Sequence, residues 1–442
     1  MRAPVTIQFL NHASIKLITP TVTIVADPWL SGAIFNNGWE LLRESPELIP
    51  VAADSDFVWI SHEHPDHFSP GFFRSIEGTK PRVLFQETRD HRVTRYLGAR
   101  GFDTIEIGHC ERIKVSPTEY FTIGRNGLYD SWSLFESDRL KILNINDCIL
   151  KSDRVLRNMK RRIGHVDVLL TQFSYAGWVG NRNNKTLHEE AAKRRLEVVR
   201  RQIECLEPDF VIPFASFSWY CHEENAYLNR SINRIRDFLD VSRDSRSVPI
   251  VLMPREAWAV GELHDNSEAV EFWERTYDAI PLRSLRVCRS RVAMASLWRE
   301  CDAYQRRVFT KNSKAWMKLL ASLPFVGLFR PVYIRLTDIQ KTVRFSFFDE
   351  LQEVSDSHEP DIEMSCESLA FMFANEFGFD TLMVNARFNA NKRGLDRVMR
   401  NFAVGTVNTI GWAVGWSMFA LFVREFKLIW LVIHELNNVN PE

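Results

Sequence analysis

Ser61-His62-Glu63-His64-Pro65-Asp66-His67 follows directly after the apolar run Asp56-Phe57-Val58-Trp59-Ile60. Residues 62–67 thus bring three imidazoles and the carboxylate of Asp66 into one short segment at the end of a predicted buried strand. Neutral imidazole and carboxylate are ligands that suit Zn²⁺ or Fe, and a strand that ends in a tight loop can aim several of them at one point. The stretch therefore predicts a metal site. A solvated histidine-rich loop is the alternative.

The spacing of these side chains suggests how they divide between ions. His62 and His64 could clasp one ion, which leaves Asp66 and His67 for a second ion close by. We expect Zn²⁺, one ion or two, with Fe or Mn as the alternative. Asp66 is also the residue that we expect to be catalytic.

Residues 62–67 resemble the HxHxDH signature of the metallo-β-lactamase superfamily. Other segments narrow the resemblance to the metal domain of CMP-N-acetylneuraminate hydroxylases, namely residues 5–14, 27–32, 38–42, 141–148 and 213–217. The resemblance covers roughly residues 5–260 and implies an α/β fold, the metallo-β-lactamase αββα sandwich. In such a fold two sheets face each other with helices outside, and their loops would bring His62 and Asp147 together.

Asp147 and an oxygen donor near residue 120 are the next candidate ligands. Asp147 ends an apolar strand, where an ionised carboxylate is costly unless it is paired or metal-bound. In the superfamily a carboxylate at this place bridges two metals; a structural hydrogen-bonding role is the alternative. Many relatives carry a histidine after the strand near residue 115, but this chain has Ser116-Pro117-Thr118-Glu119-Tyr120 there. We expect Asp130 or Glu119 to supply an oxygen ligand instead, which would favour iron or manganese over zinc.

Two alternative roles are considered for each of three further residues, His222, Asp27 and His12. His222 resembles a histidine similarly placed in the hydroxylase family, which implies metal or substrate contact, and a surface histidine is the alternative. Asp27 is interpreted as a turn residue that can also hold a metal-ligating imidazole from behind. His12 is interpreted as a buried hydrogen-bonding residue or as a partner of the same kind.

Composition and length indicate a folded protein of two domains. The 442 residues are too many for one ordinary core, so we expect a metal domain over residues 1–260 and an α+β accessory domain over residues 261–442. Lys+Arg and Asp+Glu are balanced at 56 each, which argues against nucleic acid as a partner. Seven scattered cysteines without CxxC pairs favour reduced thiols in the cytoplasm. No apolar signal region precedes the first strand, so export is not expected.

Hydrophobic periodicity predicts the elements of both domains. The first domain is expected to have a helix over residues 186–205 and strands over residues 5–9, 14–18, 21–26, 57–60, 82–85, 104–107, 131–136, 141–146, 166–170 and 210–213. The second is expected to be helical over 292–323 and 369–377, with strands over 332–336, 342–348, 361–365 and 381–388. That order loosely resembles sterol-carrier-type domains. A plain accessory or dimerisation domain, which would make the protein a homo-oligomer, is the alternative.

The segment 402–423 carries no charged side chain and is long enough to approach a bilayer core. Its polar and small residues, among them Gly405, Asn408 and Gly411, weaken that signal. We expect a buried helix or a peripheral membrane contact through the C-terminus rather than a span.

Two classes of function fit these patterns, both with a small-molecule substrate. A metal-dependent hydrolase would use a metal-bound hydroxide to attack an ester, amide, lactone or phosphoester. A non-haem iron oxygenase, acting on a nucleotide sugar or a similar molecule, is the alternative that the resemblance to the hydroxylases implies. The hydroxylases also carry a Rieske cluster, whose irons need paired Cys and His ligands. This sequence has no Cys-x-His followed by Cys-x-x-His, so an oxygenase would need a separate redox partner. We favour the hydrolase.

Overall fold

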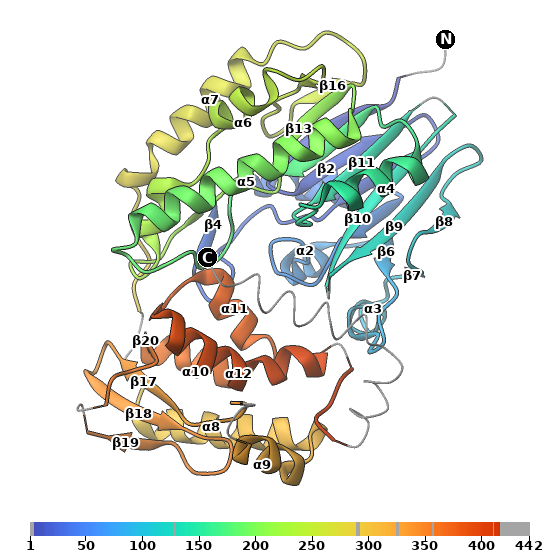
Figure 1. Ribbon diagram of the computed structural model, residues 1–442. Helices are drawn as coiled ribbons and strands as arrows, with labels where there is room; N and C mark the ends of the chain where they lie inside the picture. The colour runs from blue at the N-terminus through green and yellow to red at the C-terminus, as the bar shows by residue number, and fades with distance from the viewer. Residues whose placement is uncertain are drawn as a thin grey trace.

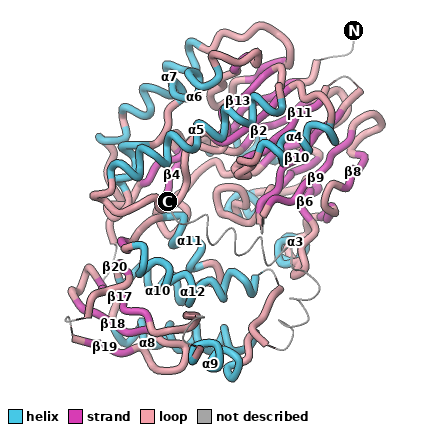
Figure 2. Tube along the Cα trace, in the orientation of Figure 1, coloured by secondary structure: helices cyan, strands magenta, loops and turns pink. Residues whose placement is uncertain are grey.

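The computed structural model describes residues 4–127, 129–138, 140–288, 292–323, 327–355, 358–409 and 411–415. Figure 1 shows two bodies, with the N-terminal part in blue to yellow above the C-terminal part in orange to red. Figure 2 shows that strands form the centre of the N-terminal part, while helices and strands lie in separate layers of the C-terminal part.

The first sheet of the N-terminal part has seven strands in the order β16-β1-β2-β3-β5-β6-β7. Their bounds are β1 Thr6–Asn11, β2 Ser14–Ile18, β3 Thr23–Ala26, β5 Phe57–Ile60, β6 Arg82–Gln86, β7 Thr104–Ile107 and β16 Ala257–Ala259. The strands β16, β1, β2 and β3 are antiparallel, whereas β3, β5, β6 and β7 run parallel. The carboxyl ends of β3 and β5 therefore meet at one edge.

The second sheet also has seven strands, in the order β15-β13-β12-β11-β10-β9-β8. Their bounds are β8 Glu111–Lys114, β9 Tyr120–Asn126, β10 Asp130–Glu136, β11 Lys141–Asn146, β12 Val168–Gln172, β13 Phe210–Phe214 and β15 Val248–Pro249. The two sheets share one core, in which the rings of Trp59 and Phe121 lie 5.9 Å apart. A short ribbon of β4 Trp39–Leu41 and β14 Ser218–Tyr220 completes the strands of this part.

Helices cover the outer faces of both sheets. On the first sheet, η1 Pro46–Leu48, α1 Ile49–Ala53, α2 Pro70–Ser75 and α3 Arg92–Gly98 bury their apolar residues against Val58, Ile60 and Phe85. On the second lie α4 Asp153–Ile163, α5 Lys185–Leu206, η2 Ala226–Ser231, α6 Ile235–Ser242 and α7 Ser267–Asp278, followed by η3 Ile280–Leu282. This layering confirms the expected αββα sandwich.

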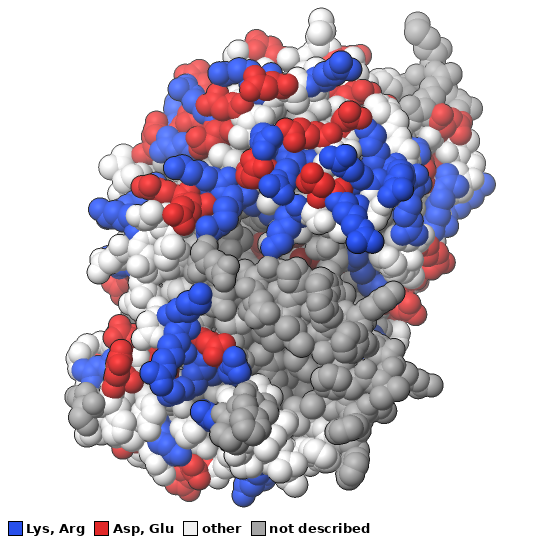
Figure 3. All heavy atoms as spheres, viewed as in Figure 1, with Lys and Arg blue, Asp and Glu red and all other residues white. Residues whose placement is uncertain are grey.

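The amphipathic pattern of α5 explains its place in the outer layer. Val199 and Ile203 are buried in the core, whereas Arg200 pairs with Glu197 and Glu204 on the exposed side. Figure 3 shows acidic and basic side chains interspersed over this layer of helices. The apolar stripe thus faces the sheet and the charges face water.

The C-terminal part is built on a five-stranded sheet in the order β19-β18-β17-β20-β21. Its strands are β17 Val332–Leu336, β18 Lys341–Phe345, β19 Gln352–Val354, β20 Ile362–Met364 and β21 Asn389–Ala390. Its helices are α8 Met294–Lys311, α9 Lys314–Ser322, α10 Cys366–Ala374, α11 Gly378–Asn385 and α12 Lys392–Thr409. An aromatic cluster of Tyr304, Phe345, Phe373 and Phe402 fills the core between them.

The strand expected over residues 381–388 is wrong, because this segment forms most of α11. The run Thr381-Leu382-Met383-Val384 has apolar and β-branched residues typical of strands. In the structure, however, Phe379 and Leu382 are spaced three residues apart and both enter the core of the C-terminal part. Ala386 ends the helix with a left-handed φ of 56°.

The structure also bears on the expected domain boundary at residue 260 and on the uncharged segment 402–423. The core of the N-terminal part extends beyond residue 260, since Trp273 of α7 packs against Phe217 at 4.2 Å. The beginning of the uncharged segment 402–423 lies in α12, where Phe402 is buried, and residues 416–423 are outside the described part. Within the described ranges, no helix is long and apolar enough to cross a membrane.

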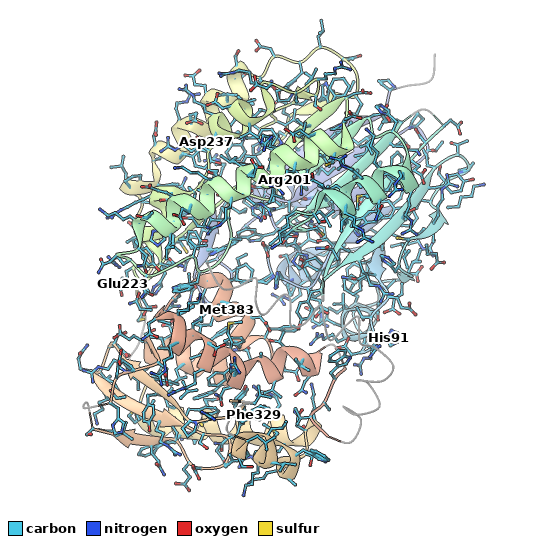
Figure 4. The ribbon with its side chains drawn as sticks, in the orientation of Figure 1. His91, Arg201, Glu223, Asp237, Phe329 and Met383 are labelled. Atoms are coloured by element: carbon cyan, nitrogen blue, oxygen red, sulfur yellow. The ribbon has the colours of Figure 1, made fainter. Side chains whose placement is uncertain are left out.

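Arg387 joins the two parts. Its side chain is fully buried, with Nε 2.6 Å from Glu224 Oε2 in the N-terminal part and Nη1 3.0 Å from Glu367 Oε1 on α10. Nearby, Asn385 donates to the Phe35 carbonyl at 3.1 Å. Met383, labelled on α11 in Figure 4, accepts a hydrogen bond at its carbonyl from the Trp178 backbone at 2.9 Å. Helix α11 is therefore docked directly on the N-terminal part.

Replacing Arg387 with alanine should lower the free energy of unfolding by about 3–5 kcal/mol, because two partly buried carboxylates would lose their cation. Urea unfolding followed by circular dichroism measures the loss. The control Arg306→Ala removes an exposed ion pair with Asp302 on α8 and should cost less than about 1 kcal/mol. Equal losses in both variants would contradict a special role for Arg387.

Candidate metal centre

The histidine loop is held in place by the carboxylate of Asp27, which follows β3 and is fully buried. Its Oδ1 accepts from the Ser61 backbone at 2.7 Å, and its Oδ2 accepts from Ser61 Oγ at 2.7 Å. The same Oδ2 lies 2.9 Å from His67 Nδ1 and accepts from the Asn146 amide at the end of β11. A carboxylate behind a ring nitrogen fixes the ring orientation, and the other nitrogen, Nε2, is left for a metal.

Asp147 stands between two imidazoles of the loop. Its Oδ2 lies 3.6 Å from His62 Nε2 and 3.5 Å from His67 Nε2. His64 Nδ1 lies 2.8 Å from His62 Nε2, and Asp130 Oδ1, at the start of β10, lies 3.9 Å from the same nitrogen. The carboxylates come from the second sheet and the imidazoles from the first, so the centre sits where the edges of the two sheets meet.

Asp66 and His67 form a second group with His12, which follows β1. His67 Nε2 lies 3.2 Å from Asp66 Oδ2, and His12 Nε2 lies 3.6 Å from the same oxygen. The Nδ1 of His12 accepts from the Phe217 backbone at 3.1 Å, which turns Nε2 toward the carboxylate. His12 was not predicted as a ligand. Its one sequence signal is its position at the end of a strand that reaches this edge.

The structure brings together six of the seven predicted ligands, namely His62, His64, Asp66, His67, Asp130 and Asp147. His222 is placed elsewhere, in a separate group with Cys288 and Glu367. The carboxylate of Glu119, the alternative to Asp130, accepts hydrogen bonds from the hydroxyls of Ser116 and Thr21. Of the two proposed oxygen donors, Asp130 is therefore the one beside the histidine loop.

Burial keeps two of the imidazoles neutral. It lowers the pKa of His62 to about 3, although the Asp147 carboxylate acts in the opposite direction. Burial also lowers the pKa of His12, against the effect of Asp66. Because only the neutral imidazole has a free lone pair, both side chains are in the form that binds a metal.

The pKa values of His67, Asp147 and Asp66 are each shifted toward the charged form of the side chain. Burial alone would lower the pKa of His67, but Asp66, Asp147 and Asp27 outweigh it and raise that pKa well above its usual value. Burial alone would raise the pKa of Asp147, but His62 and His67 outweigh it, so this pKa is lowered. The pKa of Asp66 falls well below its usual value for the same reason, since His67 and His12 outweigh burial. Protonated His67 thus balances part of the charge of these carboxylates, and a metal bound at its Nε2 would take the place of that proton.

The donor set fits a divalent metal ion. Among the described residues, Asp66 Oδ1, His67 Nε2 and Asp147 Oδ1 are buried and have no hydrogen-bond partner. Buried polar atoms without partners are rare and costly, unless an ion or a ligand satisfies them. These three atoms belong to the two groups around Asp147 and Asp66, so ions bound to these groups would give them partners.

The C-terminal part borders this centre. Arg92 pairs with Glu63 of the histidine loop at 2.8 Å, stacks over Phe377 at 4.2 Å and lies 3.7 Å from Glu376. On another side, Tyr129 donates to the Thr406 carbonyl of α12 at 2.9 Å. The segment before α11 and the end of α12 therefore lie against residues that flank the metal loop.

Comparison with known proteins agrees with this geometry. Residues 6–215 match the family model of the beta-lactamase superfamily domain. The cytidine monophosphate-N-acetylneuraminic acid hydroxylase of Danio rerio is 24% identical over 248 residues, which are 51% of this chain and 40% of that protein. The inactive homologue of Homo sapiens is 26% identical over 242 residues, which are 51% of this chain and 48% of that protein. The chain thus spans less than half of the length of these relatives.

Solved structures with a similar fold include CmlA, a diiron beta-hydroxylase from Streptomyces venezuelae, with a TM-score of 0.44 and 16% identity over 59% of this chain and 55% of that one. Igni18, a metallo hydrolase from Ignicoccus hospitalis, has a TM-score of 0.40 and 16% identity over 57% of this chain and 97% of that one. The family match over residues 6–215, together with the αββα layers and the HxHxDH loop, shows that the N-terminal part of this chain belongs to the metallo-β-lactamase superfamily.

Proposed function

We propose that this protein is a hydrolase that works with two metal ions at the histidine loop. The observation that carries the proposal is the place of Asp147, whose Oδ2 lies 3.6 Å and 3.5 Å from the Nε2 atoms of His62 and His67. A carboxylate between two imidazoles can bridge two ions. We assign His62, His64 and Asp130 to one ion, and Asp66, His67 and His12 to the other.

Divalent ions held by these residues would supply two kinds of chemistry: a lower pKa for a bound water and polarisation of the oxygen of an electrophile. The chain contributes the positioning. Asp66 faces His67 and His12 with Oδ2, while its Oδ1 has no hydrogen-bond partner among the described residues and can accept a proton of the attacking water in a hydrogen bond. Asp66 is thus our catalytic residue. The substrate class is a small ester, amide, lactone or phosphoester.

A second candidate is an oxygenase with iron, supplied with electrons by a separate redox protein. The observation that favours it is Asp130, which gives the centre a third carboxylate beside Asp66 and Asp147. Hard oxygen donors move the preference of a site from zinc toward iron or manganese. The hydroxylases that the N-terminal part resembles point the same way.

Elemental analysis and an optical spectrum of protein purified without added metal distinguish the two. Zinc with no absorption in the visible range would support the hydrolase. Two irons with a charge-transfer band would overturn it in favour of the oxygenase. The comparison uses the full chain as isolated, because added metal could replace the native ion.

Replacing His64 or Asp66 with alanine should abolish activity together with the metal bound at the histidine loop, because each variant loses a ligand from that loop. Circular dichroism should show an intact fold. The control His91→Ala changes an exposed histidine that pairs with Glu106 and should keep its metal. Full metal occupancy in both loop variants would refute the assigned site.

Asp147→Asn should lower the metal content by about one equivalent, because an amide is a poorer bridge than a carboxylate. Elemental analysis of the purified variant checks the number. A stoichiometry equal to that of the unchanged protein would rule out bridging by Asp147.

Asp27→Asn should weaken metal binding about 10–100-fold, because the charge that orients His67 and raises its basicity is removed. Asparagine accommodates the left-handed backbone at this position, where φ is 39°, so the turn itself is preserved. Competition with a chelator measures the affinity. Asp56→Asn, at the opposite end of β5, is the matched control and should bind metal normally; equal affinities in the two variants would contradict this role.

A further inference from the structure

We propose a second metal site, distinct from the histidine loop, at the junction of the two parts. Its ligands are His222, which follows β14, Cys288, in the connection after η3, and Glu367, in the first turn of α10. One ligand atom from each of the three lies within 4.8 Å of the others. Three segments far apart in the sequence therefore converge on one point. The proposal does not depend on the proposed hydrolase function.

His222 has the geometry of a metal ligand. The side chain is fully buried, and its Nδ1 accepts from the Glu224 backbone at 3.3 Å and also lies 3.3 Å from Glu224 Oε2. In the part of the chain that the structure describes, its Nε2 is buried without a hydrogen-bond partner. For Nε2 to present its lone pair to an ion, Nδ1 must carry the proton and donate it to the Glu224 carboxylate instead of accepting from the Glu224 backbone. A metal at Nε2 removes the cost of a buried nitrogen without a partner.

The residues around the cluster have a net negative charge that a divalent cation would neutralise. Arg387 is the cation in direct contact, and it faces two carboxylates, Glu224 at 2.6 Å and Glu367 at 3.0 Å. One guanidinium against two carboxylates leaves one negative charge, and ionisation of Cys288 makes it two. The neighbouring Arg286 is already paired with Glu40. A divalent ion would bring the sum to zero.

Arg387 is also placed to support an ionised thiol. Its Nη2 lies 3.5 Å from Cys288 Sγ and can donate to it. A hydrogen bond from a cation stabilises a thiolate, which is the form of cysteine that binds metals. Imidazole, thiolate and carboxylate together suit tetrahedral Zn²⁺, with water or another donor in the fourth position.

An ion at this site would link the N-terminal part to the C-terminal part. His222 belongs to the N-terminal part and Glu367 to α10, which packs on α11. An ion bound by both would fix α11 against the N-terminal part at a point beside the Arg387 contacts. The site would therefore stabilise the arrangement that places the C-terminal part next to the catalytic centre.

Cobalt substitution tests the site, because a thiolate ligand gives Co²⁺ a strong charge-transfer band that imidazole and carboxylate ligands do not. The full chain loaded with Co²⁺ should show this band. Cys288→Ser and His222→Gln should remove it, and Glu367→Gln should weaken it. His64→Ala, in the other centre, should keep it, and so should Cys110→Ser, a partly exposed cysteine on another surface.

Cys148 is the alternative source of such a band, because it is buried next to Asp147 in the catalytic centre. A band that survives Cys288→Ser but disappears in Cys148→Ser would overturn the proposal. The absence of any band in the fully loaded protein would overturn it as well.

A second measurement covers variants that fold poorly. In unchanged protein, Zn²⁺ should slow the alkylation of Cys288 by iodoacetamide at least several-fold, as measured by mass spectrometry of the labelled peptide. Alkylation of Cys110 should not change. Equal rates for Cys288 with Zn²⁺ and with a chelator would overturn the site, whatever metal the histidine loop holds.

Discussion

The buried carboxylate of Asp27 is the constraint on which the proposed metal centre depends. It receives hydrogen bonds from the backbone and hydroxyl of Ser61, from His67 and from Asn146. These partners come from the histidine loop and from the end of β11, so one side chain ties the two sheets together at the edge where the metals would bind. A buried ion needs this many partners to offset its desolvation. The loop is therefore rigid before any metal arrives.

The C-terminal part packs beside the edge where the histidine loop lies. Arg92 links Glu63 of the histidine loop to Phe377, and Tyr129 reaches α12. Just beyond lies Asp380 of α11, whose pKa is raised by burial although Thr406 donates to it and His64 lies near. These side chains would border the approach of a substrate to metals bound at the proposed centre. We therefore expect α11 and α12 to influence which small molecules enter.

Much of the centre was predictable because the chemistry is concentrated in one loop. The strands 57–60, 104–107 and 141–146 were predicted with the bounds that the structure has, since each is a short apolar run between turn residues. The loop and Asp147 end strands of different sheets, so their convergence was expected from the resemblance to the metallo-β-lactamase sandwich. Metal ligation itself remains a prediction.

What the sequence could not reveal depends on contacts between distant segments. His12 joins the centre through the packing of β1 against the loop after β13, and nothing in its neighbourhood marks it as different from other strand-end residues. Helix α11 was missed because its β-branched and apolar residues are read as a strand when the core that they enter is unknown. The group of His222, Cys288 and Glu367 spans two separate cores, so no spacing rule could have found it.

The charges buried at the catalytic centre favour two ions over one. Four carboxylates contribute four negative charges when ionised, namely those of Asp27, Asp66, Asp130 and Asp147. Arg195 of α5, whose pKa is lowered to about 10 by burial, offsets one of these charges. Three remain. A metal at His67 Nε2 would displace the proton that these carboxylates favour there, so one divalent ion would leave a negative centre, which would repel an anion, whereas two would leave one positive charge. That excess positive charge would draw a carboxylate or phosphate group of the substrate toward the metals, because charge is poorly screened in a partly buried site.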